Sequence, residues 1–262
     1  MSESIRAVER ALDVLSCFSH QTPELTMTQI AEQIGINKST VHRLLATLEG
    51  KRFVERDPVT GIYRLGIRSL QMAYLTLGHN DLRQLAAPFL HHLCKQYREN
   101  VNLAVLDGAD VIYIDVIESP QRVKLAAAIG QRLPAFCTAS GKAILACMPQ
   151  ENVQRILELG MPRHTQHTLD SPEAFFENMY HTRERGYAIS EQEFEEGINA
   201  VAAPIFFDNK QPVGSISVAG PSYRFTHDRM IEIGAMVVAT AQEIAQQIQL
   251  LPIHFLGQLK PL

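Results

Sequence analysis

The chain has 262 residues, of which 46% are hydrophobic and 20% charged, a composition typical of a soluble globular protein with two modest domains and not of a disordered one. Because the four cysteines are widely spaced, Met1 leads into polar residues and no apolar run reaches about eighteen residues, we expect no disulfide scaffold, no secretion signal and no membrane span. The formal net charge of -4 excludes a generally basic protein, yet residues 37–68 hold seven Lys or Arg against three acidic residues. We therefore expect a reduced, cytoplasmic protein with no membrane partner and one local basic surface.

The first predicted helix, over residues 5–18, has an apolar stripe at helical spacing. The stripe consists of Ile5, Val8, Ala11, Leu12, Leu15 and Phe18. We expect it to cover the two helices that follow and so to complete a three-helix unit. Arg6 and Arg10 lie off the stripe, where they can reach phosphates, although an exposed arginine on a surface helix is more often only solvated.

Residues 25–66 predict a helix-turn-helix followed by a wing. Two short apolar faces recur at helical spacing, formed by Met27, Ile30, Ala31 and Ile34 and by Val41, Leu44, Leu45 and Leu48. Gly35 fits a tight turn that needs a positive φ, and Asn37 fits the N-cap of the second helix. An ordinary amphipathic hairpin would leave the coincidence of these signals unexplained.

The second of these helices has a polar, basic face opposite its leucines, as a helix that enters a DNA groove requires. The predicted DNA-contacting residues are Lys38, Ser39, Thr40, His42, Arg43 and Thr47, with Thr28 on the helix before. Arg43 is the best candidate for a base edge, because a guanidinium can pair bidentately with guanine. After Gly50, strand-like runs over 53–56 and 62–65 flank a turn at 57–61 and predict a wing, whose Arg56 and Arg64 would hold the DNA backbone.

A short helical pattern from Ile67 to Leu77 predicts a linker helix, and Gly78-His79-Asn80 is the best candidate boundary. The expected domains are thus a winged helix-turn-helix over 1–66, a linker helix over 67–79 and a second domain over 80–262. A helix over 82–97 should open that domain, and Pro88 inside it predicts a kink or a late start.

The sequence pattern predicts that the second domain is α+β, with an antiparallel sheet that carries helices. Strand-like runs cover 101–106, 111–117, 123–128, 198–207 and 213–219, with a hairpin turn at Asp107-Gly108 and a polar turn at 208–210. Helical patterns cover 140–147, 151–159, 172–185 and 226–249.

Three groups of residues have the composition of a phosphate-binding, metal-binding or catalytic site but lack the spacing or the partners that such a site requires. Ser140-Gly141-Lys142 has no glycine five residues before Gly141, and Ala143 stands where a phosphate loop has Ser or Thr, so we expect no nucleotide site there. The sets His91, His92, Cys94 and His164, His167 lack the paired spacing of a zinc site. The acidic residues Glu191, Glu193, Glu195 and Glu196 are interpreted as a solvated loop, since no nucleophile accompanies them. We therefore predict no catalytic residue, no metal and no cofactor, and a protein that is not an enzyme.

Several motifs, spread over nearly the whole chain, resemble the IclR-type family of bacterial transcriptional regulators. They are Val8-Glu-Arg-Ala-Leu12, Ser39–Leu45 and Tyr63–Gly66, then Leu133-Pro134, Thr138–Ala143, Gly186-Tyr187, Gly197, Val201–Ile205 and Ser217–Pro221. The resemblance implies a winged helix joined to a GAF-like effector-binding domain. It also implies a homodimer or homotetramer on double-stranded operator DNA, a repressor of a catabolic or metabolic operon that responds to a small organic or aromatic acid.

The resemblance also implies an effector site. Its residues would be Gly130, Gln131, Ser190, Ile198, Ala200, Ser217 and Ala219. Where some members have an acidic residue, a cysteine and a second serine, this chain has Ser190, Ala200 and Ala219, so we expect a carboxylate with a more apolar or aromatic body than the shortest keto acids. Lys142, at a turn into a helix near the pocket, would pair an acid.

The alternative function is a small-molecule-binding protein or enzyme that uses its winged helix for protein contacts. Such a protein would lack the steep loss of DNA affinity with salt that phosphate contacts cause.

Overall fold

The computed structural model describes residues 5–19, 22–78, 81–207 and 211–249, and the chain divides into two compact units, residues 1–79 and 80–262. The predicted polar turn at 208–210 and part of the predicted boundary, His79-Asn80, lie outside the described residues. Within the described part, no helix is both long enough and apolar enough to cross a membrane.

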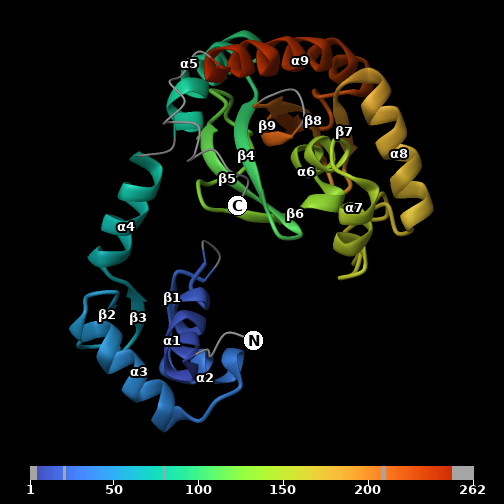
Figure 1. Cartoon of the computed structure of the whole chain (residues 1–262). Coiled ribbons are helices and arrows are strands. Elements are labelled where there is room, and N and C mark those ends of the chain that lie inside the picture. The colour runs from blue at the N-terminus through green and yellow to red at the C-terminus, as the bar shows by residue number, and fades with distance from the viewer. Residues whose placement is uncertain (1–4, 20–21, 79–80, 208–210, 250–262) are drawn as a thin grey trace. The chain divides into compact units, whose positions relative to one another are not determined.

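The first unit is a small helical bundle with a three-stranded antiparallel sheet in the order β1-β3-β2 (Figure 1). Its elements are α1 (Arg6–Ser16), β1 (Glu24–Leu25), α2 (Met27–Ile34), α3 (Lys38–Gly50), β2 (Val54–Arg56), β3 (Tyr63–Leu65) and α4 (Ile67–Gly78). The predicted helix-turn-helix, wing and linker helix are therefore confirmed as structural elements.

Local hydrogen bonds define the ends of α2 and α3. Thr26 and Gln29 form a capping box at the start of α2, and Gly35, at φ 65°, ends that helix in the left-handed region. The Asn37 side chain accepts a hydrogen bond from the Thr40 amide at 3.0 Å and so caps α3. The predicted roles of Gly35 and Asn37 are both confirmed.

The predicted apolar stripe on α1 is only partly right. Val14 is fully buried and Leu15 and Phe18 pack against the core of this unit, but Val8 and Leu12 are 53% and 57% exposed. The apolar surface of α1 is thus wider than the face that α2 and α3 can cover. Ile5, before the helix, is exposed in the same way.

The second unit has one six-stranded antiparallel sheet in the order β6-β5-β4-β9-β8-β7. Its strands are β4 (Asn100–Asp107), β5 (Asp110–Ile117), β6 (Arg132–Pro134), β7 (Ala188–Glu191), β8 (Ile198–Phe206) and β9 (Pro212–Pro221). Its helices are α5 (Asp81–Tyr97), α6 (Ala139–Leu145), α7 (Gln150–Leu157), α8 (Pro172–Arg185) and α9 (His227–Gln249), with a 3-10 turn at Ala135–Cys137.

Side-chain alternation divides this unit into two layers around the sheet (Figure 1). Val101, Val201 and Val218 face α5 and α9 in the larger core. Ala104 packs on the opposite side, with residues of α6, α7 and α8, and Ala202 contacts the alanines of α6 there. The sheet therefore has α5 and α9 on one face and the shorter helices on the other.

One expected strand of this unit is wrong. Residues 123–128 form no strand, because their carbonyls bond to side chains of distant segments: Arg224 donates to the Val123 carbonyl and Asn100 to the Leu125 carbonyl. The helix predicted over 82–97 is confirmed, and of the two effects predicted from Pro88, a kink or a late start, the late start does not occur, since α5 begins at Asp81. The short strands β6 and β7 had no counterpart in the sequence pattern.

Candidate nucleic-acid interface and ligand cavity

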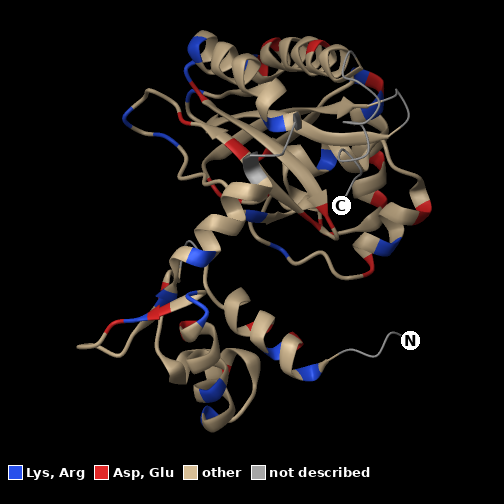
Figure 2. Cartoon of the chain, turned by 60° about the vertical axis from the view of Figure 1, so that its left-hand side comes forward, with Lys and Arg blue, Asp and Glu red and all other residues tan. Residues whose placement is uncertain are grey.

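Helix α3 presents most of the predicted DNA-contacting residues to solvent. Val41, Leu45 and Leu48 are buried and fix the orientation of the helix in the first unit. The opposite face carries five exposed side chains, Lys38, Ser39, His42, Arg43 and Thr47, while Thr40 is half-buried at the helix start. Figure 2 shows the basic segments on α1 and α3.

Two polar side chains of α3 are held by hydrogen bonds within the helix and its N-cap. Ser39 Oγ donates to Asn37 Oδ1 at 3.0 Å, and Thr47 Oγ1 donates to the Arg43 carbonyl at 2.9 Å. Among the described residues, Lys38 and Arg43 form no ion pair, so both cations remain available to an anionic partner.

The wing is a β2-β3 hairpin with an ordered loop. The Asp57 carboxylate accepts hydrogen bonds from the Val59 and Thr60 amides at 2.9 and 2.7 Å, and these bonds lower the pKa of Asp57. The Arg56 guanidinium lies 5.8 Å from the centre of the Tyr63 ring. Arg64 pairs with Glu55 at 3.4 Å, and both side chains are exposed, so this weak pair can be exchanged for a phosphate contact.

The two remaining predicted DNA contacts lie on other helices of the first unit. Thr28, at the start of α2, and Arg10, on α1, are both half-buried. They are therefore less accessible than the residues of α3 and the wing.

The second unit contains a cavity of about 290 Å³ between β8, β9, the start of α6 and the segment that follows β5. Six of the seven predicted effector residues line it: Gln131, Ser190, Ile198, Ala200, Ser217 and Ala219. The seventh, Gly130, is not in the lining; its amide donates to the Tyr113 carbonyl at 2.7 Å in a turn at φ 84°.

Strand alternation explains why these residues meet. Val201 and Val218 point into the core under α5 and α9, so Ala200 and Ser217, their neighbours in the chain, point to the other face, where the cavity lies. Ser215 and Ser217 lie on this same face of β9, and both are buried.

The buried part of the cavity lining carries polar side chains without a charge. The Asn102 amide donates to Ser217 Oγ at 3.4 Å, while Asn102 Oδ1 is buried without a hydrogen-bond partner among the described residues. Ser190 Oγ donates to the Cys137 carbonyl at 3.3 Å. Burial raises the pKa of Tyr113 to about 12, so its phenol is neutral at physiological pH.

Several lining residues escaped the sequence-based prediction. They are Tyr113, Lys124, Leu125, Ala126, Ala127, Leu133, Cys137, Thr138, Ala139, Ser140, Phe194 and Glu195. The Thr138–Ala143 motif pointed to the start of α6, but the side chains that come from residues 113 and 124–127 had no local signal. Lys124 and Glu195 are exposed and supply the charges of the lining.

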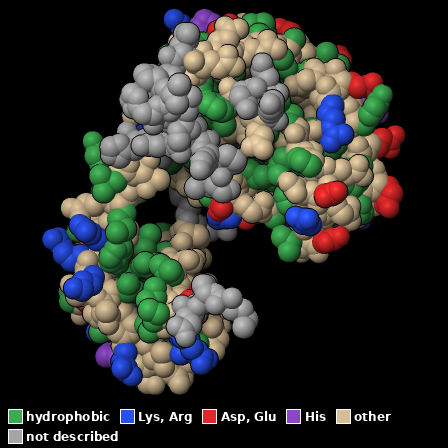
Figure 3. Space-filling view, viewed as in Figure 1, with side chains coloured by type: hydrophobic (Ala, Val, Ile, Leu, Met, Phe, Trp, Pro, Cys, Tyr) green, Lys and Arg blue, Asp and Glu red, His purple; other side chains and the backbone are tan. Residues whose placement is uncertain are grey.

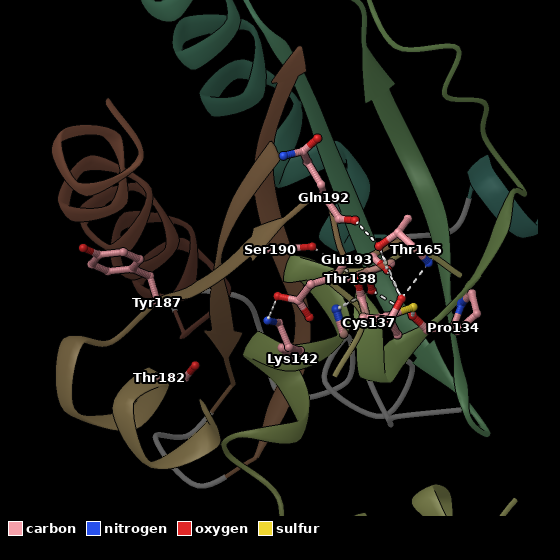
Figure 4. A network of polar contacts seen from close by, with 12 residues as sticks. Pro134, Cys137, Thr138, Lys142, Thr165, Thr182, Tyr187, Ser190, Gln192 and Glu193 are labelled. Atoms are coloured by element: carbon pink, nitrogen blue, oxygen red, sulfur yellow. Dashed lines mark hydrogen bonds and ion pairs between the residues drawn. The ribbon is translucent and has the colours of Figure 1, made fainter. Parts of the chain in front are cut away.

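A buried ion pair lies behind one wall of the cavity (Figure 4). Lys142 on α6 is fully buried and pairs with Glu193, which is 6% exposed. The interpretation of Glu193 as part of a solvated acidic loop was therefore wrong, whereas the pairing of Lys142 with an acid is confirmed. Burial lowers the pKa of Lys142 and raises that of Glu193, and the pairing opposes both shifts.

Hydrogen bonds from a third segment fix the loop that contains Glu193. Thr165 Oγ1 donates to the Gln192 carbonyl at 2.6 Å (Figure 4). Thr168 Oγ1 donates to the Glu193 carbonyl at 2.7 Å. Phe194 and Glu195, the next two residues, line the cavity. The ion pair and the threonines thus determine where this wall lies.

The histidines and cysteines weighed as metal ligands do not converge. His91 and His92 are exposed whereas Cys94 is buried, and the His164 ring packs against Phe136 and Phe194. In the part of the chain that the structure describes, no three His, Cys, Asp or Glu residues are grouped as metal ligands.

Comparison with known proteins agrees with this arrangement. Residues 7–58 match the model of the IclR helix-turn-helix domain, and residues 74–246 match that of the bacterial transcriptional regulator IclR C-terminal domain. The transcriptional repressor IclR of Escherichia coli (strain K12) is 33% identical over 243 residues, 92% of this chain and 89% of that protein. The regulator KipR of Bacillus subtilis (strain 168) is 32% identical over 95% of this chain and 99% of its own length.

The fold is shared with solved regulators. An IclR transcriptional regulator from Alicyclobacillus acidocaldarius superposes with a TM-score of 0.83 at 28% identity, over 94% of this chain and 99% of that one. The relatives are named as transcriptional regulators and repressors, not as enzymes. The chain therefore belongs to the IclR family of bacterial transcriptional regulators, and it is a DNA-binding protein with a helix-turn-helix domain and a C-terminal regulatory domain.

Proposed function

We propose that the protein is a cytoplasmic repressor of a catabolic or metabolic operon, released from its operator by a small organic or aromatic acid. Residues 1–66 would bind DNA, residues 67–79 would link the domains, and residues 80–262 would bind the effector and a second subunit. The observation that carries the proposal is the cavity in the regulatory unit, lined by six residues that the family resemblance implies for an effector and charged only at the exposed Lys124 and Glu195.

The assignment of DNA contacts rests on exposure and charge in the first unit. Arg43 would read a base edge, and Arg56 and Arg64 on the wing would hold the backbone. The other proposed contacts are Lys38, Ser39, Thr40, His42, Thr47, Arg10 and Thr28. The half-buried pair Arg10 and Thr28 fits backbone contacts near the edges of the interface better than base contacts.

The chemistry of the lining supports the choice of effector. A volume of about 290 Å³ is at the lower end of the range for ligand pockets, so the cavity suits a small molecule. Ser217, Gln131 and the neutral Tyr113 supply hydrogen-bond donors for a carboxylate, while Leu133 and Phe194 supply an apolar surface. A small carboxylate with an apolar or aromatic body matches both features.

Exposed apolar side chains on the first unit support the proposal that a second copy of the chain binds there. Val8 and Leu12 on α1 are exposed, as are Leu70, Tyr74 and Leu75 on α4. Figure 3 shows apolar side chains gathered on one face of this unit. Because exposed apolar patches mark interfaces and one recognition helix reads only a few base pairs, we propose a homodimer, or a homotetramer of two such dimers, on paired half-sites.

A binding screen tests the effector class. We expect calorimetry or thermal shift to detect benzoate-like or other apolar-bodied carboxylates more strongly than pyruvate or glyoxylate. Binding of only the shortest, most polar acids would refute the proposed class.

A further inference from the structure

The segment between β5 and β6, residues 118–131, forms one wall of the effector cavity and is here termed the strap. Lys124, Leu125, Ala126 and Ala127 of the strap line the cavity opposite residues of β8 and β9. The strap has no regular secondary structure apart from a turn at its end. Its ends are fixed by hydrogen bonds, at residues 130 and 131 by backbone bonds to Tyr113 and at Ser119 by a bond from its hydroxyl to the Arg98 carbonyl, so the position of the stretch between them depends on side chains of other segments.

Apolar burial contributes little to holding the strap. Val123 is 59% exposed and Ile129 is 44% exposed, and Arg122, Lys124 and Ala126 are exposed as well. Segments with few buried apolar contacts open at low free-energy cost unless polar bonds fix them.

The strongest of these polar bonds come from Arg224, in the turn between β9 and α9. Its Nε donates to Glu99 Oε1 at 2.7 Å and its Nη2 to Glu99 Oε2 at 2.8 Å, while Nη2 also donates to the Val123 carbonyl at 2.7 Å. The Glu99 carboxylate is only 1% exposed. The Arg224 guanidinium thus connects this buried carboxylate with the backbone of the strap. This three-acceptor geometry suits the planar fork of an arginine and not a lysine ammonium.

Glu99 is itself held in place. A Cβ atom added at Gly220 would lie 2.7 Å from Glu99 Oε2, so the carboxylate packs directly on the backbone of β9. A second, weaker tether lies beside it: Asn100 Nδ2 donates to the Leu125 carbonyl at 3.3 Å, and Asn100 Oδ1 accepts from the Ser119 amide at 3.2 Å.

We propose that Arg224 is a positioning residue for the effector site, which fixes the strap as a wall of the cavity and so controls access to it. Arg224 follows the strand that carries Ser217 and Ala219, and its guanidinium reaches the strap next to Lys124, so it links two walls of the cavity. The inference rests on the proposal that this cavity takes an effector.

Two chemical readouts of strap opening need no effector. The exposed Arg122 and Lys124 are trypsin sites within the strap, and Cys137, which is buried in the cavity wall, is a target for N-ethylmaleimide once the cavity opens. Each variant of the full chain is treated with trypsin or with N-ethylmaleimide at pH 8, and the products are identified by mass spectrometry. Cleavage after Arg155 on α7 and labelling of Cys147, which lies outside this cavity, report opening elsewhere.

The variants separate strap release from general loss of stability. Arg224→Lys keeps the charge but cannot reach all three acceptors, and Glu99→Gln weakens the hold on Arg224 if the lysine variant folds poorly. Tyr223→Phe is the matched control, because it removes only the bond between Arg224 Nη1 and the exposed Tyr223 hydroxyl.

We expect R224K and E99Q to speed cleavage in the strap and labelling of Cys137 by about tenfold or more, the factor for losing one hydrogen bond to a charged group. Cleavage after Arg155, labelling of Cys147 and the Y223F variant should stay within about twofold of the wild type. Unchanged strap cleavage in both variants, or an equal rise at Arg155, would overturn the inference. Failure to find an effector would instead count against the proposed function and leave these results unaffected.

Discussion

Lys142 and Glu193, 51 residues apart in the chain, form an ion pair in which the ammonium is fully buried. Glu193 Oε1 accepts from Lys142, while Glu193 Oε2 is buried with no hydrogen-bond partner in the described part of the chain. The pair joins α6 to the loop that supplies Phe194 to the cavity. It lies behind the cavity wall, where solvent hardly reaches it: Lys142 is fully buried and Glu193 is 6% exposed.

Removal of the ammonium should destabilise the protein strongly. In Lys142→Met the Glu193 carboxylate stays buried without its partner, and we expect the free energy of unfolding to fall by about 3 to 5 kcal/mol. The double variant K142M/E193L removes both charges and should recover most of that loss. Urea unfolding at pH 7 measures both, and Lys95→Met, at an exposed site on α5, is the control. A double variant as unstable as K142M would show that the pairing is not the cause.

Alkaline pH should destabilise the fold through Cys137. Burial, with a smaller contribution from the nearby Glu193 charge, raises the pKa of this thiol from 9.0 to about 12. Between these values the unfolded chain loses the proton and the folded chain keeps it, so stability falls as pH rises, by up to about 1.4 kcal/mol per pH unit. Urea unfolding from pH 8 to 10.5 should show a steeper decline for the wild type than for Cys137→Ala. Parallel declines would contradict the assignment.

Arg43 should contribute to DNA affinity and specificity. Arg43→Ala should cost about 1 to 3 kcal/mol at a preferred operator, because a bidentate contact to a base edge is lost. The operator can be recovered by selection from random-sequence DNA, and affinity measured by fluorescence anisotropy at several salt concentrations. Arg155→Ala, on an exposed site in the other unit, should leave affinity unchanged. Equal binding by R43A and the wild type would refute the proposed role.

A larger side chain at residue 200 should block the effector and spare DNA binding. Ala200 on β8 lines the cavity, so Ala200→Leu fills space that the ligand needs. We expect calorimetry to detect no binding of the acid that the wild type prefers, while affinity for the operator without effector stays the same. Retained acid binding by a folded A200L variant would place the effector elsewhere.

The sequence predicted best what is encoded locally. The periodic leucines of α3, the cap at Asn37 and the turn at Gly108 are each specified within a few residues, and the structure contains all three. The seven proposed effector positions came from the family resemblance, since strand alternation alone allowed the face of β9 with Ser215 and Ser217 to be either a pocket wall or a solvent-exposed face of the sheet.

The errors concern residues whose environment is set by distant segments. Residues 123–128 have the apolar content of a strand, but Arg224 and Asn100 bind the carbonyls of that segment. Glu193 looks like a surface acid, yet its partner lies on a helix far away in the chain. Val8 and Leu12 have the spacing of core residues but lie beyond the small face that the first unit can cover.

The most direct test of effector-controlled repression is the affinity for the selected operator with and without a saturating amount of the preferred acid. We predict that the acid lowers the operator affinity of the wild type by about tenfold or more, within the range of coupling energies between allosteric sites. A200L should show no response. An acid that binds the wild-type cavity by calorimetry and leaves its operator affinity unchanged would contradict the proposed function.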